Sequence, residues 1–150
     1  PGYGEAVARI RIPKIAIDLV IGVGTDDAAL QKGPGLWTSG STPGSPGNAT
    51  VVGHRTTYGS PFRNIDELIL GDRIEIEVPG RETAVFEVRE TQVVAPSEVG
   101  VTGPTPGVRL TLITCDPPGS TGRRLVVQAE LIEGEFDDLA VAPTDWQFQR

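Results

Sequence analysis

Glycine and proline constrain this chain more than any other residue types. The 150 residues include 19 Gly and 13 Pro, and these recur along the whole sequence. Because both residues interrupt helices and central strands, the segments between them have to be short. The fold must therefore be assembled from many short elements joined by turns.

Most of the short segments carry the pattern of a β-strand. Apolar and polar residues alternate most clearly in Arg-Ile-Glu-Ile-Glu-Val at 73–78, as expected for a strand with one buried face. The segment 15–21 is apolar enough to be buried on both faces. We expect strands at residues 7–12, 15–21, 49–54, 73–78, 83–94, 108–114 and 124–133. This many strands with turn-rich joints predicts a mostly-β barrel or sandwich.

Helical segments are few and short. Residues 25–33 offer a Thr or Asp cap, a short apolar stretch and a terminal Gly, so we expect a helix there. A second short helix, closed by a Gly, is expected at 61–72. The Gly-, Ser- and Pro-rich stretch 40–48 lies between expected strands and is predicted to be a surface loop, whereas the tail from Asp137 onward has no strand pattern. At this length we expect residues 1–150 to form a single domain.

The charge of the chain argues against two classes of partner. Thirteen basic and 20 acidic residues give a net charge of −7, whereas nucleic-acid binders and polybasic membrane-surface proteins need a positive field. One Cys and one His cannot form the usual zinc ligand set. The acidic pairs Asp26-Asp27 and Asp137-Asp138 could bind Ca²⁺, but neither fits an EF-hand loop. We therefore expect no metal and no cofactor.

Cys115 and His54 are the single cysteine and the single histidine of the chain. A thiol becomes a strong nucleophile when a nearby imidazole favours the thiolate. Each of the two residues ends an expected strand and opens a loop, which is a rigid yet reachable position for a reactive group. The alternative is a buried structural cysteine and an incidental histidine, and local sequence does not decide between them.

Two arginines begin the strand that follows the Cys115 loop. Acyl transfer by a thiol needs a group that stabilises the oxyanion, and a fixed cation serves that purpose. The connection between Cys115 and this strand is short enough to return Arg124 to the side of the thiol. Arg123 and Arg124 are also in the position where strands often carry solvated charges, so the local pattern leaves both interpretations open.

Three motifs, taken together, resemble those of the sortases, the cysteine transpeptidases of Gram-positive cell surfaces. The chain has Val-Val-Gly-His-Arg-Thr-Thr-Tyr-Gly-Ser-Pro-Phe at 51–62, Thr-Leu-Ile-Thr-Cys at 111–115, and Arg124 directly before the apolar Leu-Val-Val. Sortases show a His in a Gly-His element, a Cys in a Thr-Leu-x-Thr-Cys element, and an Arg before an apolar return strand. The resemblance covers roughly residues 7–133. The form of the His element is most similar to class E sortases of actinobacteria.

The resemblance implies a role for each matched residue. Cys115 would be the nucleophile, His54 the acid and base, and Arg124 the residue that stabilises the oxyanion or holds the substrate, with Arg123 as the alternative. Thr114, next to the nucleophile, matches the family Thr and would help to bind substrate. Tyr58 matches the aromatic residue of the class E His element and would either bind substrate or pack as a structural side chain.

The same resemblance implies a fold, a reaction and a location. The fold would be a closed sortase-type β-barrel of about seven to eight strands with one or two short helices. The enzyme would cleave the Thr–Gly bond of an LPxTG or LAxTG sorting signal on surface proteins, form a thioester, and pass the acyl group to a peptidoglycan precursor amine of the lipid II type. It would work at the extracellular face of the membrane, with residue 1 lying downstream of a single-pass anchor that is absent from this chain.

Two rival functions remain at this point. The first is a pilin-polymerising sortase, which would use a pilin lysine as the amine. Such enzymes often carry an N-terminal lid, and few residues precede the first expected strand here. The second is a non-catalytic β-barrel binding module whose Cys and His are incidental.

Overall fold

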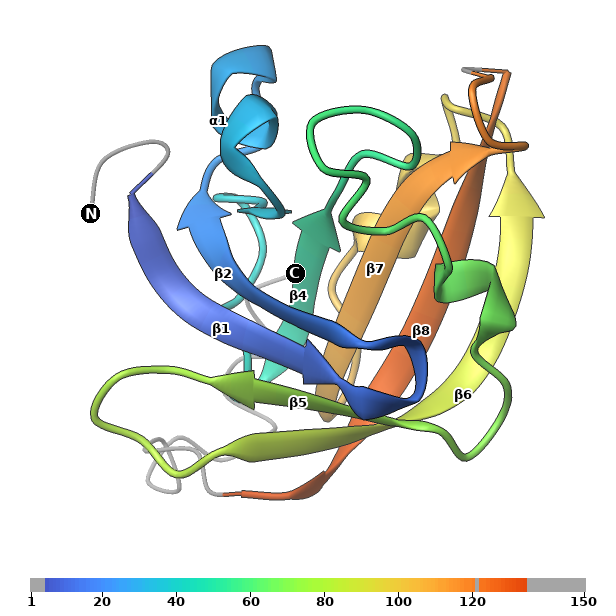
Figure 1. Cartoon of the computed structure of the whole chain (residues 1–150). Helices are drawn as coiled ribbons and strands as arrows, with labels where there is room; N and C mark the ends of the chain where they lie inside the picture. The colour runs from blue at the N-terminus through green and yellow to red at the C-terminus, as the bar shows by residue number, and fades with distance from the viewer. Residues whose placement is uncertain (1–4, 121, 135–150) are drawn as a thin grey trace.

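Eight strands form one closed barrel in the part of the chain that the structure describes. The structure is a computed structural model, and it describes residues 5–120 and 122–134. The strands follow one another around the barrel in the order β1-β2-β3-β4-β7-β8-β6-β5 (Figure 1). Their bounds are β1 Ala6–Ile12, β2 Ile17–Val23, β3 Gly35–Leu36, β4 Gly47–Val52, β5 Arg73–Glu77, β6 Ala84–Val94, β7 Val108–Asp116 and β8 Arg123–Glu133. The predicted closed, mostly-β barrel is confirmed.

The alternation in the sequence decides which side chains fill the barrel. In β5, Ile74 and Ile76 are fully buried, whereas Arg73, the first residue of the strand, is exposed. On β1, which pairs with β5, Ile10 and Ile12 are also fully buried. Because successive side chains of a strand point to opposite faces, each strand turns one apolar face inward. The inner faces of the strands together form a single core.

The one α-helix among the described residues lies where the sequence predicts it. Helix α1 spans Asp27–Lys32, and the Asp26 side chain caps it by accepting a hydrogen bond from the Ala29 amide at 3.0 Å. Gly33 ends the helix. Three short 3₁₀ helices complete the described elements: η1 Pro13–Ile15, η2 Ile65–Glu67 and η3 Val99–Thr102. No described helix has the length and apolar character to cross a membrane.

The helix predicted at 61–72 is wrong. The structure has only the 3₁₀ helix η2 there. Phe62, Ile65 and Leu68 are buried at a spacing of three residues, which matches the period of a 3₁₀ turn, and Ile69 and Leu70 are exposed. An α-helix would have placed Ile69 on the same face as Phe62 and Ile65, whereas the structure leaves Ile69 exposed.

Several strand boundaries also differ from those expected. The strand predicted at 15–21 begins at Ile17, because Pro13 opens η1 and Ala16 takes a left-handed conformation with a φ of 58°. The strand predicted at 49–54 covers Gly47–Val52, so the loop expected at 40–48 ends two residues earlier. Strand β3 was not predicted, since a strand of two residues is too short for an alternating pattern. The tail from Asp137 lies outside the described residues.

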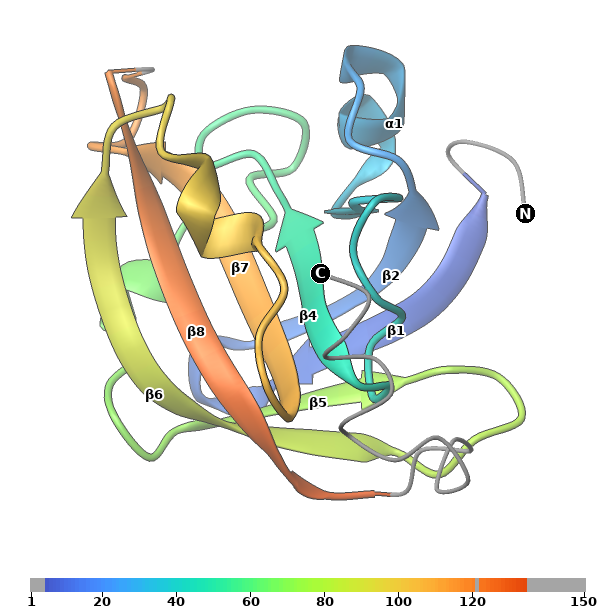
Figure 2. The same cartoon turned by 180° about the vertical axis from the view of Figure 1, so that it is seen from behind.

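Three neighbouring strands carry the candidate site. Strand β4 runs parallel to β7, with Val52 beside Ile113, and β7 pairs antiparallel with β8. On the outer face of these strands lies the segment that contains η3, which crosses in front of β7 and β8 (Figure 2). The ends of β4 and β7 point toward the same end of the barrel as α1 and the loop after β4 (Figure 1).

Candidate active site

The candidate site is built on the outer face of β4, β7 and β8. Side chains alternate between core and outer face along each strand. The core positions are Ala49 and Val51 on β4, Leu110 and Leu112 on β7, and Leu125 and Val127 on β8. Cys115 and Arg124 alternate with these core positions and therefore belong to the outer face.

Cys115 and Arg124 are direct register partners in the β7–β8 ladder. Directly opposed residues of an antiparallel pair have their side chains on the same face, with Cβ atoms about 4.5–5.5 Å apart. Arg123 pairs instead with Asp116, so its side chain leaves the opposite face. Cys115 and Arg124 are both half-buried, whereas Arg123 is exposed. The register therefore favours Arg124 over Arg123 as the cation beside the thiol.

His54 is brought to Cys115 by the parallel pairing of β4 with β7. Val52 lies beside Ile113, and the Gly53 amide still donates to the Ile113 carbonyl at 3.1 Å beyond the end of β4. Continuing both chains by two residues, from Val52 to His54 and from Ile113 to Cys115, places His54 alongside Cys115. The backbone of His54 is held from the other side by the Phe62 amide, which donates to the His54 carbonyl at 3.0 Å.

Gly53 is required by the close approach of Phe62. A Cβ atom at Gly53 would lie 2.7 Å from a ring carbon of Phe62, a distance that real Cβ atoms essentially never show. The buried Phe62 ring can therefore pack directly against the backbone before His54. This contact holds the start of the histidine loop against the barrel.

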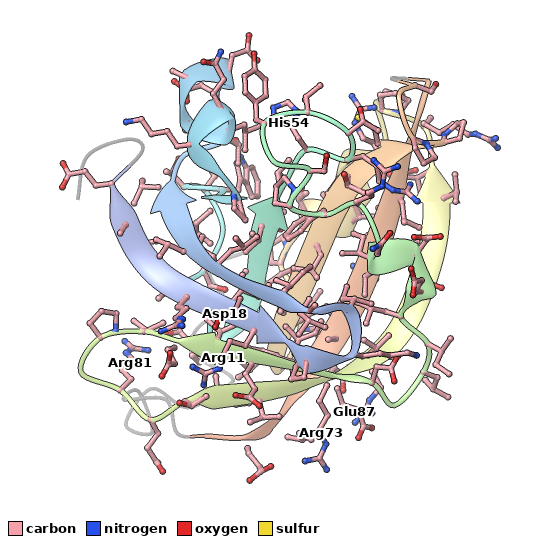
Figure 3. All side chains as sticks on the ribbon, viewed as in Figure 1. Arg11, Asp18, His54, Arg73, Arg81 and Glu87 are labelled. Atoms are coloured by element: carbon pink, nitrogen blue, oxygen red, sulfur yellow. The ribbon has the colours of Figure 1, made fainter. Side chains whose placement is uncertain are left out.

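A cavity of about 470 Å³ contains the predicted residues. Its lining includes His54, Thr114, Cys115 and Arg124. Leu30 of α1 and residues of the β7–β8 loop, Gly119 and Ser120, are further lining residues. Four of the five predicted site residues thus line one cavity, which lies at the end of the barrel where Figure 3 shows His54.

Tyr58, the fifth predicted residue, contacts His54. The two ring centroids lie 5.1 Å apart with a tilt of 48° between the ring planes. Tyr58 is exposed and has a φ of 51°, so it stands at the outer edge of the loop. In this position the ring supports the imidazole and is also open to a ligand, and its role in substrate binding stays a prediction.

Thr114 has a buried hydroxyl that is already engaged. Its Oγ1 donates to the Gly53 carbonyl at 2.7 Å, and the residue is 2% exposed. The bond ties β7 to the residue directly before His54. Substrate binding by Thr114 stays a prediction, and the observed bond favours a contribution through the position of the histidine loop.

Arg55 is the residue of the site that the sequence analysis missed. Its side chain is 4% exposed, and its Nη1 donates to the Cys115 carbonyl at 2.8 Å. The guanidinium also contacts the Arg63 carbonyl and the Asp66 carboxylate. An arginine in a Gly-rich loop is ordinarily a solvated charge, so the only sequence signal was its place next to His54.

No metal site is present among the described residues. Within 5–120 and 122–134, no three His, Cys, Asp or Glu side chains are grouped so that they could hold an ion. Asp137-Asp138, one of the two acidic pairs considered for Ca²⁺, lies outside these residues. The expectation of a protein without metal or cofactor therefore stays an expectation.

Comparison with known proteins gives a consistent match. A family model described as the sortase domain matches residues 10–132. Sortase SrtE1 of Streptomyces coelicolor is 30% identical over 146 residues, which cover 87% of this chain and 41% of that protein. Sortase A of Listeria monocytogenes is 32% identical, and the match covers 86% of this chain and 58% of that protein. The chain thus spans only about half the length of these relatives.

Solved structures match the fold over most of the chain. The crystal structure of sortase E1 from Streptomyces coelicolor with a tripeptide in the active site has a TM-score of 0.82 at 28% identity. That match covers 88% of this chain and 91% of the other. The barrel described above is therefore shared with enzymes of this kind.

Proposed function

The chain belongs to the sortase family, and from that membership we propose that it is a cysteine transpeptidase acting on peptides that carry an LPxTG- or LAxTG-type sorting signal. Cys115 is the proposed nucleophile, His54 the acid and base, and Arg124 the cation that stabilises the oxyanion. The observation that carries the proposal is the strand register: Arg124 is paired with Cys115, and His54 continues the strand that lies parallel to it.

The proposed reaction has two acyl-transfer steps. In the first, the Cys115 thiolate attacks the carbonyl carbon of the Thr–Gly bond, and the C–N bond breaks. The Gly-side amine takes a proton from His54 as it leaves, and an acyl-enzyme thioester remains. In the second, an acceptor amine attacks the thioester and gives up a proton to His54, and the thiolate leaves. The new amide carries the acyl group, and the enzyme returns to its first state.

Arg124 is proposed to act where charge develops. Both steps pass through a tetrahedral oxyanion, and a donor already aimed at that oxygen is worth about 2.7–4 kcal/mol in comparable sites. Arg124 lies on the same cavity wall as Cys115 and is half-buried, so its charge is less screened than in bulk water. This placement supports a role in the transition state.

The proposed substrates and location follow the family. The substrates are surface proteins with a C-terminal sorting signal, and the acceptor is an amine of a lipid II-type peptidoglycan precursor. A solved relative, sortase C of Clostridium perfringens, is described with the C-terminal cell wall sorting motif. Sortases are membrane-associated enzymes of the cell surface, and we place this one at the extracellular face of the membrane, held by an anchor.

Intact-mass measurement tests the proposed function. The wild-type protein is incubated with LPxTG and LAxTG peptides, and Cys115→Ala is treated in parallel. We expect a mass increase equal to the acyl fragment ending at Thr in the wild type and none in Cys115→Ala. A wild-type protein that forms no adduct with any peptide, or an equal adduct on Cys115→Ala, would contradict the proposal and favour a binding module.

The acceptor is tested in the same assay. Once the thioester forms, a peptide with a free N-terminal glycine amine and a pilin-type peptide with a lysine side-chain amine are added separately. Faster loss of the thioester with the first amine supports anchoring to the cell wall. Faster loss with the lysine peptide would assign the chain to pilin polymerisation instead.

A further inference from the structure

Arg55 carries a buried charge beside the residues proposed to react. Its side chain is 4% exposed, although a guanidinium is almost never buried unless it is paired. Nη1 donates to the Cys115 carbonyl at 2.8 Å, Nε donates to the Arg63 carbonyl at 2.8 Å, and Nη2 lies 3.2 Å from Asp66 Oδ1. We infer that Arg55 is a positioning residue that fixes His54 relative to Cys115, an inference that rests on the proposed function.

The partners of Arg55 come from three different segments. Cys115 is on β7, Arg63 lies at the far side of the loop that follows β4, and Asp66 lies in η2. A single guanidinium therefore ties the start of the loop, the end of the loop and the reactive strand together. The guanidinium group is planar and rigid, so three bonds from it define one geometry rather than a range.

His54 lies between two attachments to β7. On one side, the Thr114 hydroxyl donates to the Gly53 carbonyl at 2.7 Å. On the other side, Arg55 donates to the Cys115 carbonyl. Because the residues before and after His54 are each bonded to neighbouring positions on β7, the His54 backbone cannot slide along that strand. The His54 backbone is thereby held at one position along β7, level with Cys115.

These bonds distinguish Arg55 from an arginine in an ordinary surface ion pair. Exposed pairs contribute little, since water screens them and two long side chains lose freedom. Here two of the named partners are backbone carbonyls, and the third is the Asp66 carboxylate, which is about half exposed. The carboxylate balances the buried charge from the surface side, while the carbonyls determine where the guanidinium lies.

The rate of the proposed reaction depends on the position of the His54 imidazole. Proton transfer needs the imidazole within hydrogen-bond reach of the reacting groups, and a displacement of about 1 Å can lower a rate about 100-fold. Residues 56–60 are Thr-Thr-Tyr-Gly-Ser, and all of them are exposed or half-buried, so packing constrains this part of the loop little. Arg55 supplies the constraint that such a loop lacks.

The matched control for Arg55 is Arg11. Arg11 also contacts two partners, Glu75 at 3.0 Å and Glu77 at 2.8 Å, and it joins β1 to β5. Figure 3 shows Arg11 toward the end of the barrel opposite to His54. Its loss removes two ionic contacts between neighbouring strands away from the cavity lining, so it reports how the loss of such an arginine acts through stability.

Steady-state kinetics of peptide cleavage test the inference. We expect Arg55→Gln to lower kcat about 100-fold with KM for the peptide within about two-fold. Arg55→Lys keeps the positive charge but loses the planar set of guanidinium donors. It should therefore recover less than a tenth of the activity that Arg55→Gln loses. Added ethylguanidine should raise kcat of Arg55→Ala and not of Arg11→Ala. Unchanged kcat in Arg55→Gln, in a protein whose wild type forms the thioester, would overturn the inference and leave the proposed function intact.

Hydrogen exchange gives a readout that needs no substrate. The amides of Gly53 and Phe62 donate to the Ile113 and His54 carbonyls. In Arg55→Gln we expect these two amides to exchange at least ten-fold faster, with no change in Arg11→Gln. Equal protection in wild type and variant would contradict the inference even if the wild type proved inactive. If Arg55→Gln does not fold, Arg55→Lys takes its place with the same expected and contradicting results.

Discussion

The outer face of β4, β7 and β8 carries two polar regions of opposite character. The first, the sealed network, consists of Asn48, Thr111 and Gln128, all less than a tenth exposed. The second, the open groove, consists of His54, Cys115 and Arg124, all half-buried and lining the cavity. Both regions use outward positions of the same three strands. The difference between them therefore comes from what covers the strands.

The sealed network holds the segment that covers it. Asn48 Nδ2 donates to the Val101 carbonyl at 2.9 Å and to the Gly103 carbonyl at 3.1 Å. Thr111 Oγ1 donates to Asn48 Oδ1 at 2.7 Å, and Gln128 Nε2 donates to the Val101 carbonyl at 3.2 Å. The polar side chains bond to one another, to η3 and to Gly103 directly after it; η3 is the gold turn in front of β7 and β8 in Figure 2.

The two regions use the polar side chains of one sheet in different ways. In the sealed network, polar groups satisfied within the protein make the sheet and its cover rigid. In the open groove, the thiol and the imidazole remain within reach of a peptide, while the bonds of Thr114 and Arg55 are placed behind them. A reactive group is left accessible, and its supports are buried.

The largest expected effect concerns Arg124 in the open groove. Arg124→Ala should lower the rate of acylation about 10²–10³-fold, because the oxyanion loses its cation. The melting temperature should stay close to that of the wild type, since the side chain is half-exposed. Arg123→Ala is the matched control and should change the rate less than about two-fold. An equal loss in both variants, measured by peptide cleavage, would remove the distinction that the strand register makes between them.

The sealed network should respond in stability instead. Asn48→Ala removes the bonds to Val101, Gly103 and Thr111, and we expect a loss of about 2–3 kcal/mol in the free energy of unfolding. Urea unfolding measures it. Asn64→Ala is the control, because Asn64 is exposed and makes no capping bond, and its effect should stay within about 0.5 kcal/mol. Equal stability of the two variants would show that the network is not structural.

Tyr58 tests a weaker support within the open groove. Tyr58→Ala removes the ring that contacts His54, and we expect acylation to fall about three- to ten-fold, in line with an aromatic contact of about 0.5–1.5 kcal/mol. Tyr58→Phe keeps the ring and should retain most of the activity. If Tyr58→Phe loses as much as Tyr58→Ala, the hydroxyl and not the ring is the important group, and a direct contact with substrate becomes the better explanation.

The smallest expected effect lies outside both regions and provides a reference for acid titrations. Lys14 Nζ lies 2.6 Å from Asp72, and this bond, followed by the Ile69 amide, holds the pKa of the Asp72 carboxyl below its usual range. A lowered folded pKa stabilises the protein above the unfolded value of about 3.9. The contribution is lost as the pH falls through the folded pKa.

Asp72→Asn should therefore matter at neutral pH and not in strong acid. At pH 7 the variant should unfold with at most about 1 kcal/mol less free energy than the wild type. The difference should shrink below about pH 4. Urea unfolding across this range measures it, with Glu67→Gln, a substitution at an exposed acidic residue, as the control. A constant difference at all pH values would mean that Asp72 acts through packing and not through its charge.

The sequence predicted those parts of the molecule that depend on local pattern. Alternation identified the long strands, such as Arg73–Glu77 and Ala84–Val94, since each turns one apolar face inward. The α-helix was predicted because its cap and its final Gly are local signals. His54 and Cys115 were identified because each is the single residue of its type and matches a family motif.

What the sequence did not predict depends on tertiary surroundings. The 3₁₀ turn at Ile65–Glu67 and the short β3 are decided by packing against the barrel, and no local pattern announces them. Arg55 and Asn48 have ordinary polar side chains until neighbouring segments bury them. Their importance arises from burial, which only the assembled structure supplies.

The parallel pairing of β4 with β7 has a consequence for the way the molecule is made. His54 and Cys115 are separated by about sixty residues, and non-local pairings of this kind form slowly because a long loop must first be closed. While β4 and β7 remain apart, the newly made chain carries a thiol with no imidazole beside it. The transpeptidase activity proposed for the thiol therefore begins only when the barrel closes, and the recovery of activity during refolding would time that closure.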